Sequence, residues 1–266
     1  MKLSLVVSNK NRLFTPGTRF KERVHEINAS TWFLKSIQWQ TFQDCELVIA
    51  DGGSDNYDEL VDYFADVGGP IPIHVYRHDI GDVFLRSTLN NVGVRRAQGE
   101  YIATTDADMI FSSDFVQTVV NNVSKGIILE LKTFHLRKGA TEEIHKGKID
   151  ICSDFETCQR TRKAGKPTNS PGGCQCMHRD KWSELHGFDE SFYGWGSEDR
   201  DLVKRARMHG LKEHWVATKR GNIKILHQEH YKDVEYNLGF QETNKKRLEQ
   251  AKKAVVNKKE WGGLPV

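Results

Sequence analysis

The sequence predicts an α/β fold in which a mostly parallel sheet carries helices on both faces. In the first half of the chain, short apolar runs of strand length alternate with segments whose apolar residues recur at helical spacing. Glycine and proline breaks, such as Gly68-Gly69-Pro70, separate these elements. Strands that alternate with helices of about 10–15 residues are typical of parallel sheets covered by helices.

The elements follow one another in a regular order up to residue 131. Strands are expected at residues 3–7, 47–50, 73–75, 101–105 and 127–131, and helices around residues 32–37, 60–64, 89–97 and 116–123. Residues 137–171 interrupt this order, because the segment is polar and poor in apolar residues, and we expect a long excursion with at most a short helix. Beyond it we expect strands at 174–177, around 215 and at 223–226, helices around 182–185 and over 198–209, and a basic helical tail over 242–259.

The composition excludes several classes of protein. The 266 residues are 38% apolar and 28% charged, which is enough apolar material for a folded core. No apolar run approaches the ~20 residues that a bilayer span needs. The net charge of +3 is small for a dedicated nucleic-acid binder. Five cysteines match no small disulfide scaffold and predict a reducing compartment, the cytoplasm.

Four of the cysteines, Cys152, Cys158, Cys174 and Cys176, are enough to bind a zinc ion. Their spacing lacks the C-x2-C knuckle, so we expect buried free thiols instead, with Cys174 and Cys176 on one face of a strand.

Two carboxylates, Asp106 and Asp108, directly follow the strand expected at 101–105. Because side chains alternate along a strand, both are expected to project to one side at its C-terminal end. Ligands of open α/β sheets bind at that edge. Two hard oxygen ligands there suit Mg²⁺ or Mn²⁺ that bridges a diphosphate. The alternative is a solvated strand end.

A further carboxylate, Asp51, follows the strand at 47–50 and precedes Gly52-Gly53. The glycines let the backbone turn tightly and approach a ligand closely. Asp51 is therefore a candidate acceptor for hydrogen bonds from a nucleobase or a ribose hydroxyl. The alternative is an ordinary turn.

The segment GFDESFYGWGSEDRDL, from Gly187 to Leu202, ends in a predicted helix. Ser197 is a plausible N-cap, which would place Glu198 and Asp199 in the first turn. The helix dipole should keep both carboxylates ionised, and an ionised carboxylate can act as a general base on a hydroxyl. Trp195 offers a flat apolar face for a sugar ring. The alternative is simple helix capping beside a core tryptophan.

Two histidines, His227 and His230, follow the apolar run at 223–226. A neutral imidazole is a good ligand for a transition-series dication. One of them would complete the coordination begun by Asp108 and would favour Mn²⁺ over Mg²⁺. The alternative is a structural histidine at a strand end.

In combination, these motifs resemble nucleotide-sugar glycosyltransferases of the GT-A type, which have a Rossmann-like sheet. The segments FLKSIQWQTFQDCELVIADGGSDN and RSTLNNVGVRRAQGEYIATTDADMIF are similar to the opening and the D-x-D region of family 2 glycosyltransferases. The segment GGCQCMHRDKWSELHGFDESFYGWGSEDRDL resembles the C-terminal block of β-1,4-galactosyltransferases and chondroitin-polymerase-like enzymes. The resemblance covers about residues 3–231, apart from 137–170.

The resemblance implies roles for the matching residues. On the donor side, Asp108 would be the direct metal ligand, with Asp106 beside it at the metal and the diphosphate. His227 would be a further metal ligand, with His230 as the alternative. Asp199 would be the catalytic base. The nucleotide side would include Asp51, Arg86 and Asn91, and the donor-sugar and acceptor pocket would contain Gly173, Trp195, Gly196 and Glu198.

Two positions depart from the family pattern. Gly52 replaces the second Asp of D-D-G-S, so the expected base contact depends on Asp51 alone. Arg200 stands where the galactosyltransferases have a third acidic residue, which leaves the acceptor open.

The sequence therefore predicts a single GT-A domain in four parts: a nucleotide-sugar-binding half (1–135), an irregular excursion (136–171), an acceptor and catalytic half (172–231) and a basic helical tail (232–266). The expected reaction is the inverting, metal-dependent transfer of a hexose or N-acetylhexosamine from a UDP-sugar to a hydroxyl of a glycan or similar acceptor, in polysaccharide biosynthesis. We expect a cytoplasmic protein, with peripheral contact at the inner membrane face through the basic tail as an alternative.

Two other functions are open from the sequence. A sugar-phosphate nucleotidyltransferase also uses a parallel sheet and paired carboxylates, but it needs a glycine-rich loop where this chain has SNKNRLFTPG. A non-catalytic carbohydrate-binding protein would not need Asp108, Asp199 and His227.

Overall fold

The computed structural model describes residues 1–11, 29–67, 69–137, 139–152, 155, 164–167, 171–194, 196–217, 222–228 and 234–263. Two of the expected site residues, Trp195 and His230, lie outside the described residues, as does Cys158.

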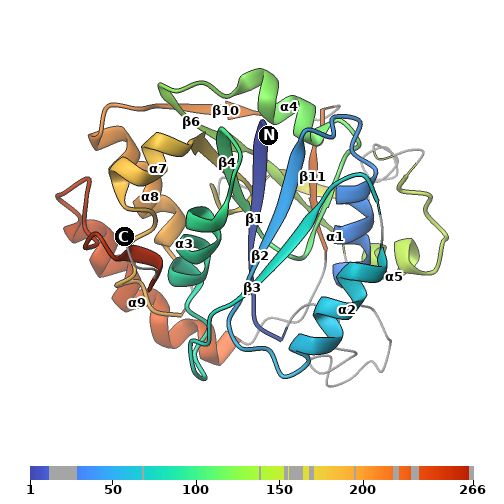
Figure 1. Cartoon of the computed structure of the whole chain (residues 1–266), viewed down its shortest axis with the longest axis horizontal. Coiled ribbons are helices and arrows are strands. Elements are labelled where there is room, and N and C mark those ends of the chain that lie inside the picture. Colours follow the sequence, from blue (N-terminus) through green and yellow to red (C-terminus); the bar gives the residue numbers. More distant parts are fainter. Residues whose placement is uncertain are drawn as a thin grey trace.

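A seven-stranded sheet runs through the middle of the molecule in the order β10-β6-β9-β4-β1-β2-β3 (Figure 1). Among these strands, β9 is antiparallel to both of its neighbours, and the other neighbouring pairs are parallel. The prediction of a mostly parallel sheet is confirmed. The strands are β1 (Leu3–Asn9), β2 (Cys45–Asp51), β3 (Ile73–Arg77), β4 (Tyr101–Thr105), β6 (Ile127–Leu131), β9 (Gln175–His178) and β10 (Lys212–Val216).

Helices cover both faces of this sheet, as the sequence predicts. In Figure 1, α1 and α2 lie to the right of the sheet, and α3, α7 and α8 lie to its left. The described helices are α1 (Ala29–Gln38), α2 (Tyr57–Val67), α3 (Arg86–Arg96), α4 (Phe115–Asn122), α5 (Ala140–His145), α7 (Arg179–Leu185), α8 (Glu198–Met208) and α9 (Val234–Gln250), with the short 3₁₀ turns η1 (Pro171–Gly173) and η2 (Trp261–Gly263).

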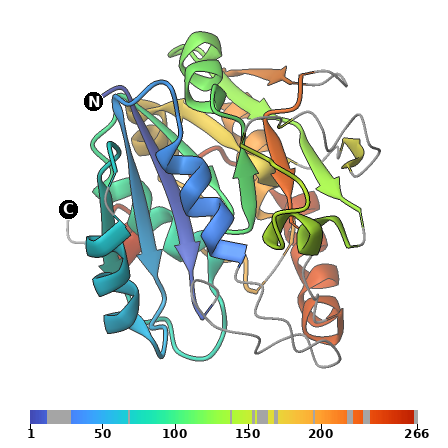
Figure 2. The same cartoon turned by 90° about the vertical axis from the view of Figure 1, so that its right-hand side faces the viewer.

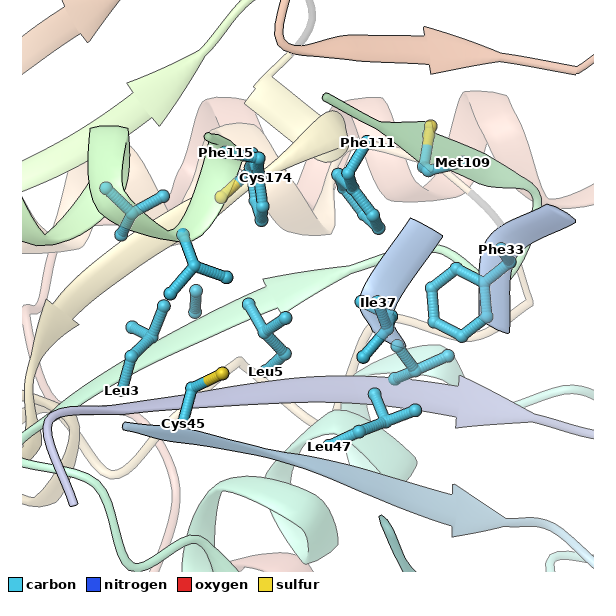
Figure 3. Close-up of a cluster of buried hydrophobic side chains, with 14 of the residues drawn as sticks. Leu3, Leu5, Phe33, Ile37, Cys45, Leu47, Met109, Phe111, Phe115 and Cys174 are labelled. Atoms are coloured by element: carbon cyan, nitrogen blue, oxygen red, sulfur yellow. The ribbon is translucent and has the colours of Figure 1, made fainter. Parts of the chain in front are cut away.

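The alternation of side chains along β1 builds a separate core on each face. Leu5 and Val7 join the apolar cluster that contains the buried residues of α1, α2 and α4, with Phe33 and Phe115 among them (Figure 3). Val6 points the other way and joins the cluster beneath α3, α7 and α8. A fully buried Leu or Val contributes about 1.5–3 kcal/mol. The two cores pack the helices onto both faces of the sheet and so fix the position of its C-terminal edge.

A smaller sheet lies beside the large one and is seen in Figure 2. Its apolar face packs with α5 in a third cluster that includes Phe134 and Leu226. The short helix expected within 137–171 is therefore present as α5, whereas the strand β8 was not expected. Its sequence, Ala-Gly-Lys-Pro, gives no strand pattern, and it forms by pairing with β7. In sheet order the strands are β5 (Met109–Phe111), β11 (Ile225–His227), β7 (Thr133–Leu136) and β8 (Ala164–Pro167).

The helix of the basic tail begins and ends earlier than the expected range of 242–259. Helix α9 ends at Gln250, and the chain continues without regular helix to η2. There Trp261 is buried in the cluster beneath α3, and Arg95 Nη1 donates to the Trp261 carbonyl at 3.0 Å. The aromatic anchor of Trp261 on α3 explains why this segment leaves the helix. Among the described helices, none has the length and apolar character to span a bilayer.

Candidate active site

The carboxyl ends of three neighbouring parallel strands, β1, β2 and β4, form the predicted edge. Asn9 at the end of β1 lies opposite Asp51 at the end of β2, and Val7 of β1 pairs with Thr105 at the end of β4. The register therefore places Asp51 and the residue after Thr105, Asp106, at one edge of the sheet. This confirms that the two carboxylate motifs meet where ligands of such sheets bind.

Asp51 is fully buried and accepts hydrogen bonds from its own loop and from the end of β1. Its Oδ1 accepts from the backbone N–H groups of Gly53 and Ser54, at 3.0 and 2.8 Å. Its Oδ2 accepts from the Asn9 amide at 2.7 Å and from the Ser54 hydroxyl at 2.5 Å. The carboxylate thus builds the turn, which was the alternative interpretation from the sequence. A role in holding a nucleotide stays a prediction.

The centre of the site is the buried guanidinium of Arg86, at the first residue of α3. Its Nε and Nη2 donate to Asp106 Oδ1 at 3.1 and 2.9 Å. Its Nη1 donates to Glu198 Oε1 at 3.0 Å and to Asp199 Oδ1 at 2.6 Å. One arginine therefore joins the D-x-D motif to the start of α8, although these residues are more than 90 positions apart in the sequence.

The electrostatics of this cluster differ from the sequence-based expectation. Burial, together with the charge of Asp199, raises the pKa of Glu198 to about 7. Burial also raises the pKa of Asp199, although the Arg86 charge opposes the shift. We expected the helix dipole to keep both carboxylates ionised. For Glu198 that expectation is wrong, because the loss of water around two adjacent carboxylates outweighs a dipole effect of about 0.3–1 kcal/mol. For Asp199 the pKa is raised, and its ionisation at neutral pH stays a prediction.

Burial disfavours the charged form of Arg86, but Asp106, Asp199 and Glu198 together raise its pKa well above the usual value. The guanidinium therefore stays charged at any pH at which the protein is folded.

The start of α8 has the expected position but not the expected cap. Glu198 and Asp199 are in the first turn, as predicted, yet the Ser197 side chain makes no capping hydrogen bond. Ser197 has a φ of 74° and Gly196 a φ of 107°, both in the left-handed region. Glycine accepts this conformation at little cost. The backbone of Gly196 and Ser197 turns the chain into α8 and points the two carboxylates at Arg86.

Asp106 and Asp108 contact different elements. A turn follows β4, with Met109 N–H donating to the Asp106 carbonyl at 3.4 Å, so the strand alternation expected for the two carboxylates does not apply. Asp106 faces Arg86, whereas Asp108 Oδ1 lies 3.7 Å from His227 Nε2.

The backbone beside this pair is held by Gln228, which donates to the Asp108 carbonyl through its N–H at 3.1 Å and its Nε2 at 3.2 Å. The sequence-based expectation that His227 lies near Asp108 is therefore confirmed.

The side chains around Asp108 are of types that bind a divalent cation, but they supply only part of the ligands that such a cation needs. A carboxylate oxygen and an imidazole nitrogen, both mostly buried, are a donor set that suits Mn²⁺. The described residues hold no group of three or more His, Cys, Asp or Glu side chains placed to bind a metal. A cation at this pair would need further oxygen ligands, which a diphosphate can supply.

Two other expected site residues, Asn91 and Gly173, make contacts within the protein. Asn91 is buried, and its amide bonds both backbone groups of Phe188 and the Glu190 carboxylate, at 2.7–2.9 Å. The structure thus places Asn91 against the loop before α8, and its place on the nucleotide side stays a prediction. Gly173 packs its backbone against Thr133, so that a Cβ there would lie 1.6 Å from the hydroxyl oxygen.

Residues that the sequence analysis did not single out complete the surroundings of α8. Gln175 of β9 donates from Nε2 to the Asp199 carbonyl at 3.0 Å. Glu130 of β6 lies opposite Gln175 in the register and is fully buried. The signal for Glu130 was present in the sequence, because a single carboxylate interrupts the apolar run IILEL.

The expectation of buried free thiols is confirmed for Cys174 and Cys176 and is wrong for Cys152, which is free but exposed. Cys174 and Cys176 are free, fully buried and in the same apolar cluster, and burial raises the pKa of each.

Comparison with known proteins identifies the family. Residues 28–183 match the model described as glycosyl transferase family 2, which is more than half of the chain. The chain belongs to glycosyl transferase family 2. Residues 157–232 of this family 2 protein also match the model described as the N-terminal domain of galactosyltransferase.

Curated relatives match the family 2 chain over shorter segments. Human beta-1,4-galactosyltransferase 3 is 33% identical over 55 residues, which cover 21% of this chain and 14% of the relative. Mouse chondroitin sulfate synthase 3 is 29% identical over 134 residues, which cover 47% of this chain and 14% of the relative. The matched segments thus span about a seventh of either relative.

Solved structures confirm the GT-A glycosyltransferase fold. TarS from S. aureus (residues 1–349, in complex with UDP-GlcNAc) superposes with a TM-score of 0.59 at 15% identity, over 88% of this chain and 60% of that one. GalNAc-T7 with UDP, GalNAc and Mn²⁺ gives a TM-score of 0.57 at 14% identity, over 87% of this chain and 44% of that one.

Proposed function

We propose that the chain is an inverting, metal-dependent glycosyltransferase that moves a hexose or N-acetylhexosamine from a UDP-sugar to a hydroxyl of a glycan or similar acceptor. The observation that carries this proposal is the contact of Arg86 with Asp106, Glu198 and Asp199. It brings the D-x-D edge of the sheet and the carboxylates of α8 into one buried cluster, within reach of a single substrate. Family membership favours sugar transfer over the nucleotidyltransferase alternative.

Asp199 is the proposed general base. Its side chain is 16% exposed, compared with 4% for Glu198, so an acceptor hydroxyl reaches it more easily. A raised pKa makes its carboxylate a better proton acceptor near neutral pH than an ordinary aspartate.

In the proposed step, the acceptor oxygen forms a bond to the anomeric carbon while the bond from that carbon to the diphosphate oxygen breaks. The hydroxyl proton passes to Asp199. A single displacement inverts the configuration at the anomeric carbon.

Glu198 is proposed to hold the acceptor. It lies beside Asp199 in the first turn of α8, and the raised pKa leaves it partly protonated near pH 7. A carboxyl near its pKa exchanges between a protonated form, which can donate a hydrogen bond to a sugar hydroxyl, and an ionised form, which can accept one. Arg86 fixes the two carboxylates relative to each other, and we assign it a positioning role toward the diphosphate as well.

The metal would be held by Asp108 and His227, with Asp106 near the diphosphate. A divalent cation bound there supplies Lewis-acid stabilisation of the charge that builds on the departing diphosphate. The mixed carboxylate and imidazole donor set favours Mn²⁺ over Mg²⁺. His230 stays the alternative ligand. UDP as the donor nucleotide is supported by the complexes of TarS with UDP-GlcNAc and of GalNAc-T7 with UDP.

We also propose that the chain works as one catalytic unit, with residues 1–135 on the nucleotide side and residues 172–231 on the acceptor side. Arg86 and Asp199 connect these two halves directly.

The deciding experiment measures UDP release from a panel of UDP-sugars, with and without Mn²⁺, for the wild type and Asp108→Ala. We expect Mn²⁺-dependent release that is lost in Asp108→Ala, with an unchanged circular dichroism spectrum. Full activity of the wild type in excess chelator would overturn the metal assignment. Tight sugar binding with no turnover of any donor would favour the non-catalytic alternative.

A further inference from the structure

A carboxylate behind the site, Glu130, has no hydrogen-bond partner in the part of the chain that the structure describes. The side chain is fully buried in the middle of β6, on the same face of the sheet as Ile128 and thus beneath α7 and α8. Within the described residues, neither of its oxygens has a hydrogen-bond partner. Leaving a buried polar group unsatisfied costs about 1–3 kcal/mol, and more if it is charged. Such a group needs an explanation.

The side chain opposite Glu130 supplies one. Gln175 of β9 is its direct partner in the antiparallel register. Opposed residues of such a pair have Cβ atoms about 4.5–5.5 Å apart, on the same face. Gln175 Oε1 is also buried without a partner among the described residues. Two unsatisfied acceptors thus face each other across the strands.

The orientation of the Gln175 amide is fixed by its other contact. Its Nε2 donates to the Asp199 carbonyl at 3.0 Å, and a carbonyl oxygen can only accept. The amide must therefore turn its NH₂ group toward α8 and its oxygen away from it. A carboxylate cannot bond to that oxygen, but a protonated carboxyl can.

We propose that Glu130 is a positioning residue that carries a proton in the working protein and donates it as a hydrogen bond to Gln175 Oε1. The bond holds the Gln175 amide in place, and the amide holds the main chain of Asp199. No proton is transferred. The protonated state is a property of the fold alone, whereas its effect on turnover rests on the function proposed above.

The charges around Glu130 agree with a protonated carboxyl. Burial, with Glu213 of β10 and Asp199 of α8, raises the pKa of Glu130 to about 8, and only Lys132 opposes the shift. The other neighbour in the register is Trp215 of β10, which is neutral. Near pH 7 the bridge is therefore intact, and above about pH 8 ionisation of Glu130 breaks it.

The test compares Glu130→Gln with Glu130→Leu. A glutamine keeps a donor for Gln175 Oε1 and cannot ionise, so we expect near wild-type kcat at pH 7 and no loss of kcat above pH 8, where the wild type declines. A leucine removes the donor. We expect kcat at pH 7 to fall about 10- to 100-fold and to show no further decline above pH 8, with unchanged UDP affinity, because a misplaced base affects chemistry more than binding.

Two further substitutions should shift the decline of kcat at high pH, which we call the alkaline limb, in opposite directions. Glu213→Gln removes a negative charge and should shift the decline of kcat to lower pH, whereas Lys132→Met should shift it to higher pH. A purely structural Glu130 would respond to neither. The inference is overturned if Glu130→Gln keeps the wild-type alkaline limb, or if Glu130→Leu keeps wild-type kcat.

An infrared difference spectrum between the wild type and Glu130→Gln gives a readout without turnover. We expect a protonated carboxyl band at pH 7 that disappears above pH 9. Absence of the band at pH 7 overturns the inference even if Glu130→Leu does not fold. If the wild type releases no UDP from any donor but shows the band, the proposed function fails and the protonated Glu130 stands.

Discussion

Two buried arginines differ in the charge balance of their surroundings: Arg205 belongs to helix α8, and Arg86 contacts the first turn of that helix. Arg205 is completely buried and forms an ion pair with Asp201, Nε to Oδ2 at 2.6 Å. Its remaining donors reach the backbone carbonyls of Leu185, Gly187 and Ala254 at 2.9–3.3 Å. One positive charge meets one negative charge, and the donors bond the ends of several segments together.

Arg86 has the opposite balance. It is the shared partner of three carboxylates, from Asp106, Glu198 and Asp199, which leaves an excess of negative charge in a mostly buried place. Burial raises the pKa of Glu198 and of Asp199, and the other carboxylates of this cluster add to the shift, whereas burial is the main cause of the raised pKa of Asp201 beside Arg205. An arginine that pairs with one carboxylate stabilises the fold. An arginine that is shared by several carboxylates indicates a site that can bind protons, cations or substrate.

The largest expected effect separates the two aspartates of α8. Asp199→Asn keeps the shape of the side chain but cannot accept a proton, so we expect kcat to fall about 10²–10⁴-fold with near-normal binding of UDP and Mn²⁺. Asp201→Asn, the matched change beside Arg205, should lower the stability and leave kcat of the folded protein near wild type. Steady-state kinetics and calorimetric titration of both variants make the comparison.

Glu198→Gln extends this test to the neighbouring carboxyl. It should raise the KM for the acceptor more than it lowers kcat. If Glu198→Gln loses most of its turnover while Asp199→Asn keeps it, the base is Glu198, and the two assignments must be exchanged.

Removing each arginine should affect stability in different ways. Arg205→Met is expected to lower the free energy of unfolding by about 3–5 kcal/mol, because it leaves a buried partner unpaired. Most of this loss should remain at pH 5.5, since the carbonyls lose their donors at any pH. Arg86→Met should be less stable at pH 8 than at pH 5.5 relative to wild type, because protonation relieves the repulsion among three carboxylates.

Urea denaturation at the two pH values checks this pair. If both variants lose the same free energy of unfolding at both pH values, the difference in charge balance does not affect stability.

A smaller effect is expected at the neighbouring cation site. His227→Ala should weaken Mn²⁺ affinity by about 10- to 100-fold, the range found when contacts of a metal site are removed. Arg205→Met, if folded, should bind Mn²⁺ like the wild type. An unchanged Mn²⁺ titration in His227→Ala, with a loss in His230→Ala, would assign the metal to the other histidine.

The smallest expected effect is a shift of the acid limb of the pH profile. Ordinary carboxyls would keep kcat constant down to about pH 5. Because burial raises the pKa of Asp199, the proposed base, we expect kcat to begin to fall at a higher pH than this. The pKa of Glu198, which is also raised, should act on the acceptor KM instead. Asp106→Asn removes one negative neighbour, lowers both pKa values and should move this limb to lower pH. A limb that does not move would contradict the proposed origin of the raised pKa values.

Much of the fold was predictable because local patterns decide it. Strands in the first half of the chain, such as β2 with its run Leu47–Ala50, contain short apolar runs, and helices such as α2 show one apolar face. The weak elements were not predictable in the same way. Strand β8 depends on pairing with β7, and the end of α9 is set by the packing of Trp261 against α3.

For the site, the sequence by itself determined which residue types stand at the ends of which elements. The D-x-D pair after β4, the carboxylates that open α8 and the histidine after an apolar run were all visible as motifs. Each follows from local rules of strand and helix ends, which need only neighbouring residues.

Only the tertiary structure decided how these groups share charge. Arg86 meets Glu198 and Asp199 across more than 100 residues, and Glu130 meets Gln175 only through strand pairing. The raised pKa values follow from burial and from neighbours that are distant in sequence. Desolvation and Coulomb energy depend on position in space, and a local pattern contains neither.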